Sequence, residues 1–319
     1  MIWGKKKILL KNPVLIDGIS RSGKSIISKI LPSLSNSEHL KVFTYFEHIM
    51  PALYYKEIKF NYIDAQLIIM LNELAYNTFI GRDVNFRPSD YTSVTSKNLK
   101  KRYLDRLKSK EGDFVIKKLI KTKNFFPFMA HEIMPNLGLL NKLTVKFKII
   151  EFYRNPVDNI YSWIQKKVCN DFIKNPRSFT LVVKDKKSKK NIPWFCGKDS
   201  KQWLKLNEYE KSVFGVCKLL EMSIRNQKMN KKTKILTLSF ENFYKEPFSN
   251  IMKISNFLNS RSTNLTKIEI KKSNCPRIEN IELRKKKETF IKEKVSKELF
   301  IRMKDLEKNY EKNIFGLSK

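Results

Sequence analysis

Short apolar runs alternate with longer segments of helical periodicity along most of the chain. Apolar runs of this length, bounded by polar residues, predict strands at 13–17, 41–46, 125–130, 145–153 and 234–240. Helices are predicted to begin at Lys24 and after Pro156, and to cover 64–79, about 97–123, 246–259 and 286–310. Strands separated by helices predict an α/β fold of three layers, with a mostly parallel central sheet flanked by helices on both faces.

The sequence contains no linker that would separate two domains. A chain of 319 residues with 41% hydrophobic content can bury a substantial core, so we expect one domain over residues 1–319. Two Lys-rich segments, 166–203 and 265–295, interrupt the alternation of strands and helices. We expect the first, at about 166–205, to be an exposed excursion, and excursions from such folds often carry substrate contacts.

Charge and cysteine content narrow the functional classes only in part. The formal net charge of +34 attracts polyanions, but a bias of the composition toward lysine explains it equally well. A zinc site or a disulfide framework is not expected, because no two cysteines form a CxxC pair and no histidine lies close to any of them; they are Cys169, Cys196, Cys217 and Cys275. Reduced thiols in the cytoplasm fit this pattern. No apolar run is long enough to span a bilayer, so a soluble protein is expected.

The stretch LIDGISRSGKSIIS, residues 15–28, has the features of a phosphate loop. Gly18 and Gly23 lie between a predicted strand and a predicted helix, and glycines there let the backbone turn tightly and direct N–H groups toward an anion. The pattern G-x-x-x-x-G-K-[ST] in this context indicates phosphate binding. The candidate phosphate ligands are Arg21, Ser22, Gly23, Lys24 and Ser25.

The strand predicted at 145–153 argues against a metal-dependent nucleotide enzyme. Such an enzyme needs an acid that holds Mg²⁺ near the end of a second strand. Here Arg154 follows the strand, and Asp158 falls inside the next helix. No metal is therefore expected, although Asp64 and Asp83 keep a Mg-ATP-dependent P-loop kinase open as an alternative.

The segment FYRNPVDNIYSWI, residues 152–164, resembles the second signature of the sulfotransferase family, in which Arg-x-Pro follows a strand and a Ser follows about two turns later. Segments 235–258 and 81–94 are similar to further family segments, and the resemblance spans about residues 13–260. It implies a P-loop fold that binds 3′-phosphoadenosine 5′-phosphosulfate (PAPS). The loop at 15–28 then holds the 5′-phosphosulfate, and Arg154 and Ser162 hold the 3′-phosphate. An arginine fork and a hydroxyl suit a phosphate dianion.

The resemblance also implies catalytic residues. Glu47 stands where several glycan and bacterial sulfotransferases keep a catalytic carboxylate, and His131 stands where the cytosolic small-molecule branch keeps its histidine. Either is a candidate base, and the choice stays open. The family loop commonly reads Ser-Gly-Thr, whereas this chain has Ser-Gly-Lys-Ser, so Lys24 is the candidate cation for the leaving oxygen.

A late basic segment is the last implied part of the donor site. Family members close such a segment over the 3′-phosphate, and Arg284 and Lys285 are the matching candidates, together with Arg277 and Lys286. A solvated helix is the alternative interpretation of this composition.

We therefore expect an enzyme that transfers a sulfuryl group from PAPS to a hydroxyl or amine of a carbohydrate or small-molecule acceptor. The excursion at about 166–205 is expected on the acceptor side. Aromatic residues among the basic loops, such as Trp163, Trp194 and Trp203, either stack on sugar rings or cap the core. The alternatives are the kinase and a non-catalytic polyanion-binding protein. Nucleic acid is not expected as a partner despite the charge.

Overall fold

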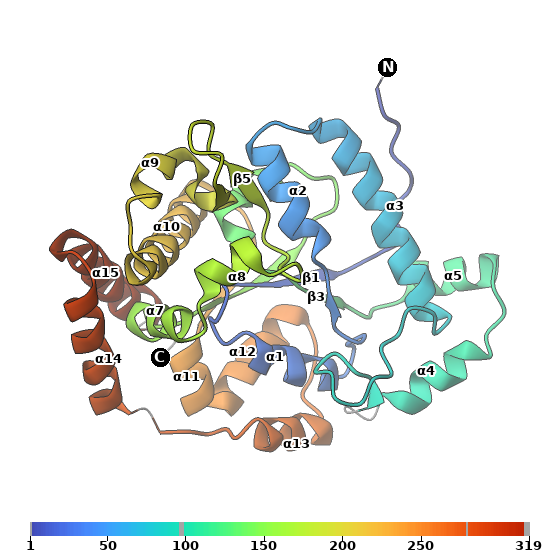
Figure 1. Cartoon of the computed structure of the whole chain (residues 1–319). Helices are drawn as coiled ribbons and strands as arrows, with labels where there is room; N and C mark the ends of the chain where they lie inside the picture. Colours follow the sequence, from blue (N-terminus) through green and yellow to red (C-terminus); the bar gives the residue numbers. More distant parts are fainter. Residues whose placement is uncertain (1, 96–98, 279, 316–319) are drawn as a thin grey trace.

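Five parallel strands form the central sheet of the computed structural model, which describes residues 2–95, 99–278 and 280–315 (Figure 1). Their spatial order is β2-β3-β1-β4-β7, and each neighbouring pair is parallel. The strands are β1 Pro13–Asp17, β2 Lys41–Val42, β3 Phe126–Met129, β4 Lys148–Tyr153 and β7 Ile235–Ser239. The predicted α/β fold with a mostly parallel sheet is confirmed.

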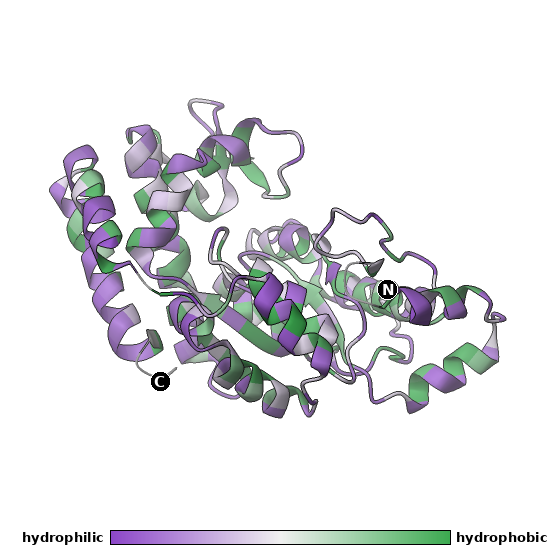
Figure 2. Cartoon of the chain, turned by 90° about the horizontal axis from the view of Figure 1, so that it is seen from below, coloured by the Kyte–Doolittle hydropathy of each residue, from purple (hydrophilic) through white to green (hydrophobic). Residues whose placement is uncertain are grey.

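Helices cover both faces of this sheet. Side chains alternate along each buried strand, so both faces present apolar side chains that the helices bury. Val14 and Ile16 of β1 pack with residues of α1 Ser25–Ile30, α12 Pro247–Leu258 and α13 Asn264–Lys272, whereas Leu15 packs on the opposite face with residues of α2 Tyr45–Tyr54 and α3 Phe60–Phe79. Hydrophobic colouring is frequent on the central strands, whereas hydrophilic and hydrophobic residues alternate along the surrounding helices (Figure 2). The remaining α-helices are α4 Lys100–Leu107, α5 Asp113–Lys121, α6 Leu137–Leu140, α7 Pro156–Gln165, α8 Val168–Lys174, α9 Ser200–Trp203, α10 Glu208–Met229, α11 Phe240–Lys245, α14 Ile281–Lys294 and α15 Lys297–Tyr310.

The strand predicted over 41–46 is wrong beyond Val42. Residues 45–54 form helix α2, and the side chains of Phe43, Phe46, Ile49 and Met50 are all buried. Their spacing of three and four residues is that of one helix face, which a six-residue window does not distinguish from a short strand. The correction matters for function, because it puts Glu47 in the first turn of a helix rather than in a loop after a strand.

Two predicted helices are each divided in the structure. The segment 97–123 forms α4 and α5, which are separated by a turn at Gly112 with φ +109°, and its residues 97 and 98 lie outside the described residues. The segment 286–310 is divided at Ser296, whose extended backbone begins α15, while α14 already begins at Ile281. In both cases a local backbone signal interrupts a periodicity that continues in the sequence.

The predicted excursion at 166–205 is exposed only in part. It carries an antiparallel hairpin, β5 Val182–Lys184 and β6 Asn191–Pro193, whose lysine-rich connection is exposed. Trp194 and Trp203 are nevertheless buried in the same apolar cluster as Trp163. The tryptophans therefore belong to the core, and stacking on sugar rings is not their role in this conformation.

Candidate active site

The phosphate loop lies at the carboxyl end of β1 and is shaped by its two glycines. Gly18 has φ +150° and Gly23 has φ +89°, both in the region that L side chains rarely adopt. A Cβ atom on Gly18 would lie 2.5 Å from the carbonyl oxygen of Phe152, and one on Gly23 would lie 2.3 Å from the ring of Phe240. The motif glycines are therefore required both by backbone conformation and by the close approach of β4 and α11.

Lys24 is folded back onto the loop. Its Nζ donates to the carbonyl oxygens of Gly18 at 2.7 Å and Ile19 at 3.3 Å, and the side chain is buried. Burial lowers the pKa of Lys24 to about 8, while the carboxylates of Asp17, Glu47 and Glu132 act in the opposite direction. The ammonium group is thus held at the loop by the two carbonyl oxygens.

Arg21, Arg154 and Ser162 meet beside the loop, although they come from distant parts of the sequence. Arg21 Nε donates to Ser162 Oγ at 3.1 Å, and Arg154 Nη1 donates to the carbonyl oxygen of Arg21 at 3.1 Å. The Arg154 guanidinium also lies over the ring of Phe240 at 5.3 Å from its centroid. The two predicted anion-binding elements, the loop and the segment after β4, are therefore one continuous site.

The buried polar atoms without a hydrogen-bond partner include two possible donors of this region, Arg154 Nε and Ser22 Oγ. Leaving such groups unpaired is unfavourable by roughly 1–3 kcal/mol each, and more for a charged group. An anion bound beside the loop would satisfy donors of this kind. Ser25 lies at the start of α1 and is exposed, so its hydroxyl is also accessible to a ligand.

Glu47 and His131, the two candidate bases, form one pair. Glu47 Oε1 accepts the backbone N–H of His131 at 2.9 Å and lies 2.9 Å from His131 Nδ1. Because Oε1 already accepts one hydrogen bond, we assign the proton of this second contact to Nδ1, which leaves Nε2 as the basic nitrogen. The structure thus joins the two alternatives that the sequence left open.

The pair lies in a buried environment that favours neutral forms. Burial raises the pKa of Glu47 to about 9, with Glu132 adding to the shift and Lys24 opposing it. Burial, followed by the charge of Lys24, lowers the pKa of His131 well below its ordinary value of 6.5. A neutral imidazole near pH 7 is the protonation state that a general base requires.

A cavity of about 340 Å³ is lined by both the loop and His131. Its lining includes Arg21, Lys24 and Tyr91, together with Asn175, Arg177, Ser178 and Phe179 of the excursion. The ring of Phe179 stacks on the ring of His131, with centroids 4.6 Å apart and planes inclined by 25°. Part of the predicted excursion therefore reaches the candidate active site, as does Tyr91 from the polar segment at 81–94.

The late basic segment is tied to the helix that carries Ser162. Arg284 Nε donates to Asp158 Oδ2 at 2.8 Å, and Lys287 Nζ donates to Asp158 Oδ1 at 2.5 Å. Lys285 is exposed on the same helix, α14. Their contact with a 3′-phosphate stays a prediction, and the observed function of Arg284 is to anchor α14 to the first turn of α7.

The sequence interpretation missed two carboxyl groups at the centre of the site. Asp17 Oδ2 accepts the backbone N–H groups of Ile133 and Met134 at 2.9 and 2.8 Å, which joins the end of β1 to the turn after β3. Glu132 accepts a hydrogen bond from Ser20 Oγ at 3.1 Å. Burial raises the pKa of Asp17 to about 6 and that of Glu132 to about 7, and Lys24 opposes both shifts. The sequence did contain a signal for both residues, because Asp17 directly precedes the loop residue Gly18 and Glu132 directly follows the candidate base His131.

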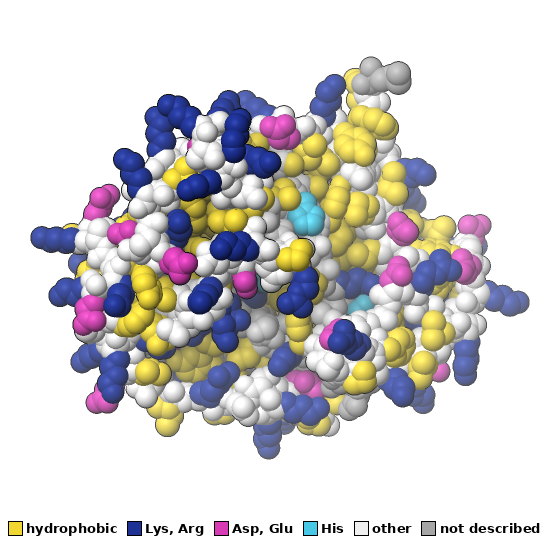
Figure 3. All heavy atoms as spheres, viewed as in Figure 1, with side chains coloured by type: hydrophobic (Ala, Val, Ile, Leu, Met, Phe, Trp, Pro, Cys, Tyr) yellow, Lys and Arg dark blue, Asp and Glu magenta, His cyan; other side chains and the backbone are white. Residues whose placement is uncertain are grey.

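Charged groups elsewhere follow no single pattern. Lys and Arg side chains are spread over the whole visible face in Figure 3 rather than gathered in one patch. Within the described part of the chain, no group of three or more His, Cys, Asp or Glu residues is arranged to hold a metal ion. No helix among the described residues combines the length and apolar character that crossing a membrane requires. Asp64, which kept the kinase alternative open, binds Thr144 and Lys5.

Comparisons with solved structures give several distant likenesses. The sulfotransferase domain from the curacin biosynthetic pathway has a TM-score of 0.44 and 11% identity, and the match covers 81% of this chain and 77% of that one. The sulfotransferase domain of the Synechococcus PCC 7002 olefin synthase has a TM-score of 0.39 and 11% identity, and the match covers 83% of this chain and 79% of that one. A Mycobacterium avium sulfotransferase has a TM-score of 0.40 and 12% identity, and the match covers 87% of this chain and 75% of that one.

Sequence comparison identifies the family. No curated protein sequence matches the chain. The family model described as the sulfotransferase domain, however, matches residues 11–315. Because this match extends over nearly the whole chain and includes the loop, the Glu47–His131 pair and the Arg154 segment, the chain belongs to the sulfotransferase family of transferases.

Proposed function

We propose that this protein uses PAPS as its donor and transfers the sulfuryl group to a hydroxyl or amine of an acceptor. The observation that carries the proposal is the hydrogen-bonded junction of Arg21, Arg154 and Ser162 beside the phosphate loop. PAPS has phosphate groups on both sides of its ribose. A site made of two adjoining cationic elements suits this donor better than a nucleotide phosphorylated on one side only.

The available donors fit the two ends of PAPS. The loop at residues 18–24 would hold the 5′-phosphosulfate, with Lys24 as its cation. Arg154 and Ser162 would hold the 3′-phosphate, and the buried, unpartnered Nε of Arg154 supports this assignment. When bound, PAPS supplies the sulfuryl group and a good leaving group.

Residues on the acceptor side would then carry out the proton transfer. His131 Nε2 takes the proton from the acceptor hydroxyl while the acceptor oxygen forms its bond to sulfur. Glu47 fixes the ring by accepting from Nδ1, so it is a positioning residue rather than the base itself. General base catalysis of this kind contributes about 10²–10⁴ in rate.

Lys24 would act on the leaving group. As the bond between sulfur and the bridging oxygen breaks, its electron pair stays on that oxygen, and the ammonium group of Lys24 stabilises the negative charge. To do so, Lys24 must exchange its bonds with the Gly18 and Ile19 carbonyls for the ligand. Its pKa of about 8 keeps most of the population cationic near pH 7.

Calorimetric titration tests the donor. We expect adenosine 3′,5′-bisphosphate to bind without Mg²⁺ and to bind more tightly than ADP or ATP. Arg154→Ala should lower the affinity for this nucleotide by at least about 10-fold, because a charged hydrogen bond is lost. Equal binding by wild type and Arg154→Ala would contradict the 3′-phosphate assignment. Preference for ATP with Mg²⁺ would favour the kinase, and no nucleotide binding would favour the polyanion-binding alternative.

We also propose a cytoplasmic location. All four cysteines are free and buried, which supports a reducing compartment. Localisation of the tagged full-length protein by cell fractionation tests this assignment.

A further inference from the structure

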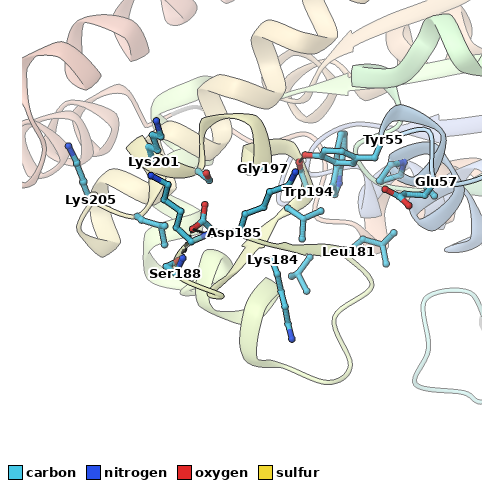
Figure 4. A pocket seen from close by; sticks show the side chains of 18 residues that line it. Tyr55, Glu57, Leu181, Lys184, Asp185, Ser188, Trp194, Gly197, Lys201 and Lys205 are labelled. Carbon is cyan, nitrogen blue, oxygen red and sulfur yellow. Dashed lines mark hydrogen bonds between the residues drawn. The ribbon is translucent and has the colours of Figure 1, made fainter.

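Another cavity lies outside the donor site, between helix α2 and the β5–β6 hairpin. It has a volume of about 1000 Å³, at the upper end of the roughly 300–1,000 Å³ typical of small-molecule sites. In Figure 4, Tyr55, Glu57 and Leu181 stand at one end of the cavity, and Ser188, Lys201 and Lys205 stand at the other.

The walls of this cavity are mainly apolar. Ala52 comes from α2, Leu181 and Val183 come from the hairpin region, and Trp194 and Leu204 come from the segment after it. The hairpin is held against α2 by the hydrogen bond from Tyr55 Oη to the carbonyl oxygen of Trp194, 2.6 Å long. A wall of this kind binds an apolar body and gives few partners to the many hydroxyls of a sugar.

The rim is cationic. Five lysines line the cavity against two carboxylates, Glu57 and Asp185; the lysines are Lys184, Lys186, Lys187, Lys201 and Lys205. Asp185 is engaged within its own turn, because its Oδ2 accepts the backbone N–H groups of Lys187 at 3.1 Å and Ser188 at 2.8 Å. The charge balance therefore favours an anionic group on whatever occupies the cavity.

Two connections lead from this cavity to the Glu47–His131 pair. Glu47 and the cavity residue Pro51 are four positions apart on α2, so they share one helix face at a separation of about 6 Å along the axis. On the hairpin side, Phe179 stacks on His131, and Leu181 lies two residues further along the chain. The cavity therefore lies next to the pair along both of these walls.

We propose that this cavity is the acceptor site and that the acceptor is an amphipathic anion, with a hydroxyl that reaches His131, an apolar body between α2 and the hairpin, and an anionic group at Lys201 and Lys205. The acceptor role rests on the proposed function, but the ligand class does not. Binding to the cavity is measurable without a donor.

Isothermal titration with matched probes tests the ligand class. The probes are 12-hydroxydodecanoate, which has a hydroxyl, an apolar chain and a carboxylate, and the neutral 1,12-dodecanediol. We expect the acid to bind at least about 10-fold more tightly than the diol, because only the acid pairs with the rim lysines. Equal affinity, or binding of neither probe, would overturn the proposal.

Variants locate the binding. Lys201→Glu combined with Lys205→Glu should lower the affinity for the acid by about 10-fold and leave the affinity for the diol unchanged. Ala52→Trp should lower the affinity for both probes, because the larger side chain fills the cavity. The matched control is Lys267→Glu with Lys271→Glu, which makes the same charge change on exposed residues of α13 and should bind like wild type. Unchanged acid binding in the Lys201 and Lys205 variant would reject the anionic end.

A parallel titration with adenosine 3′,5′-bisphosphate separates the two proposals. Normal nucleotide binding together with failed acid binding rejects only the acceptor class. If the acid binds normally and the nucleotide does not bind, the proposed ligand class of the cavity is supported and the proposal of PAPS as the donor is rejected. If Ala52→Trp does not fold, as judged by its thermal transition, the lysine variants alone decide the outcome.

Discussion

At the scale of single residues, the protonation of His131 decides what the candidate base can do. The Nδ1 contact with Glu47 assigns the proton to Nδ1, and burial with Lys24 nearby lowers the ring pKa. We therefore expect ¹⁵N NMR near pH 7 to show His131 neutral and protonated at Nδ1, which is assignable because the chain has only 3 histidines. In Lys24→Met, the removal of the nearby charge should raise the His131 pKa. An Nε2–H tautomer would contradict the assigned base.

The second prediction at this scale concerns Gly23. Replacement by Ala combines a φ of +89° with a Cβ placed 2.3 Å from the Phe240 ring, so Gly23→Ala should lower the free energy of unfolding by about 1–3 kcal/mol. Gly23→Ala should also weaken the binding of adenosine 3′,5′-bisphosphate, because the loop must shift. Urea unfolding and calorimetry check both effects.

Gly138→Ala is the matched control for this prediction. Gly138 lies in α6, and a Cβ there would meet its nearest neighbour at an ordinary 3.7 Å. That variant should keep wild-type nucleotide binding. Equal behaviour of the two glycine variants would mean that the loop geometry is not what the Gly23 contacts indicate.

At the scale of elements, the contact between α7 and α14 depends on Asp158. Although burial raises its pKa, the bonds with Lys287 and Arg284 hold the pKa of Asp158 below its ordinary value of 3.8. A carboxyl group whose pKa is lowered in the folded state adds stability above the unfolded pKa, and that stability is lost as the pH falls through the folded pKa. Asp158 therefore stabilises the docking of α14 near neutral pH.

The corresponding test is Asp158→Asn. The variant removes the negative charge that faces the largely buried Arg284 and Lys287, so we expect its free energy of unfolding near pH 7 to fall by about 1–3 kcal/mol. The difference from wild type should shrink in acid below about pH 4, where wild type also begins to lose the charge. Asp305→Asn, at an exposed position of α15, is the control and should change little. A difference that does not vary with pH would exclude the ionised pair as its cause.

The parallel arrangement of the strands explains the catalytic pair. Glu47 follows β2 and His131 follows β3, and these two strands are paired in parallel, so their carboxyl ends meet at one edge of the sheet. The sequence interpretation found both residues, which are 84 positions apart, but treated them as alternatives because each matched a different branch of the family. Strand order is a property of the assembled sheet, and local patterns do not contain it.

At the scale of the whole molecule, the net charge is +34, and Lys and Arg side chains are spread over the face that Figure 3 shows. Diffuse charge attracts polyanions through many weak contacts that depend steeply on salt. We therefore expect double-stranded DNA to bind at about 50 mM salt and to be largely released at about 200 mM, where a protein making 6–10 phosphate contacts loses roughly 10³–10⁵ in affinity.

The nucleotide should behave differently from DNA. Adenosine 3′,5′-bisphosphate should still bind at the higher salt concentration, because its contacts are few, specific and partly buried. Fluorescence anisotropy with labelled DNA and calorimetry with the nucleotide measure the two affinities. Retention of DNA at high salt together with loss of the nucleotide would favour a polyanion-binding protein.

Most of the fold was predictable from the sequence. The prediction was wrong where a local pattern of residues fitted more than one structure. β1 was predicted with its observed bounds of 13 and 17, because a short buried run between polar residues has few alternatives. The strand at 41–46 failed, because Phe43 and Phe46 fit either period over so few residues. The excursion was judged by its lysines, whereas Trp194 and Trp203 are buried in the core.

The sequence by itself determined the local elements that bind anions, because a phosphate loop and an arginine after a strand require only nearby residues in a fixed order. It also determined the alternation that builds the sheet. Tertiary structure alone decided that Arg21 reaches Ser162, that Glu47 orients His131, and that α2 and the hairpin enclose an apolar cavity. The physical reason is that these contacts depend on strand order and helix packing, which are set by burial over the whole chain.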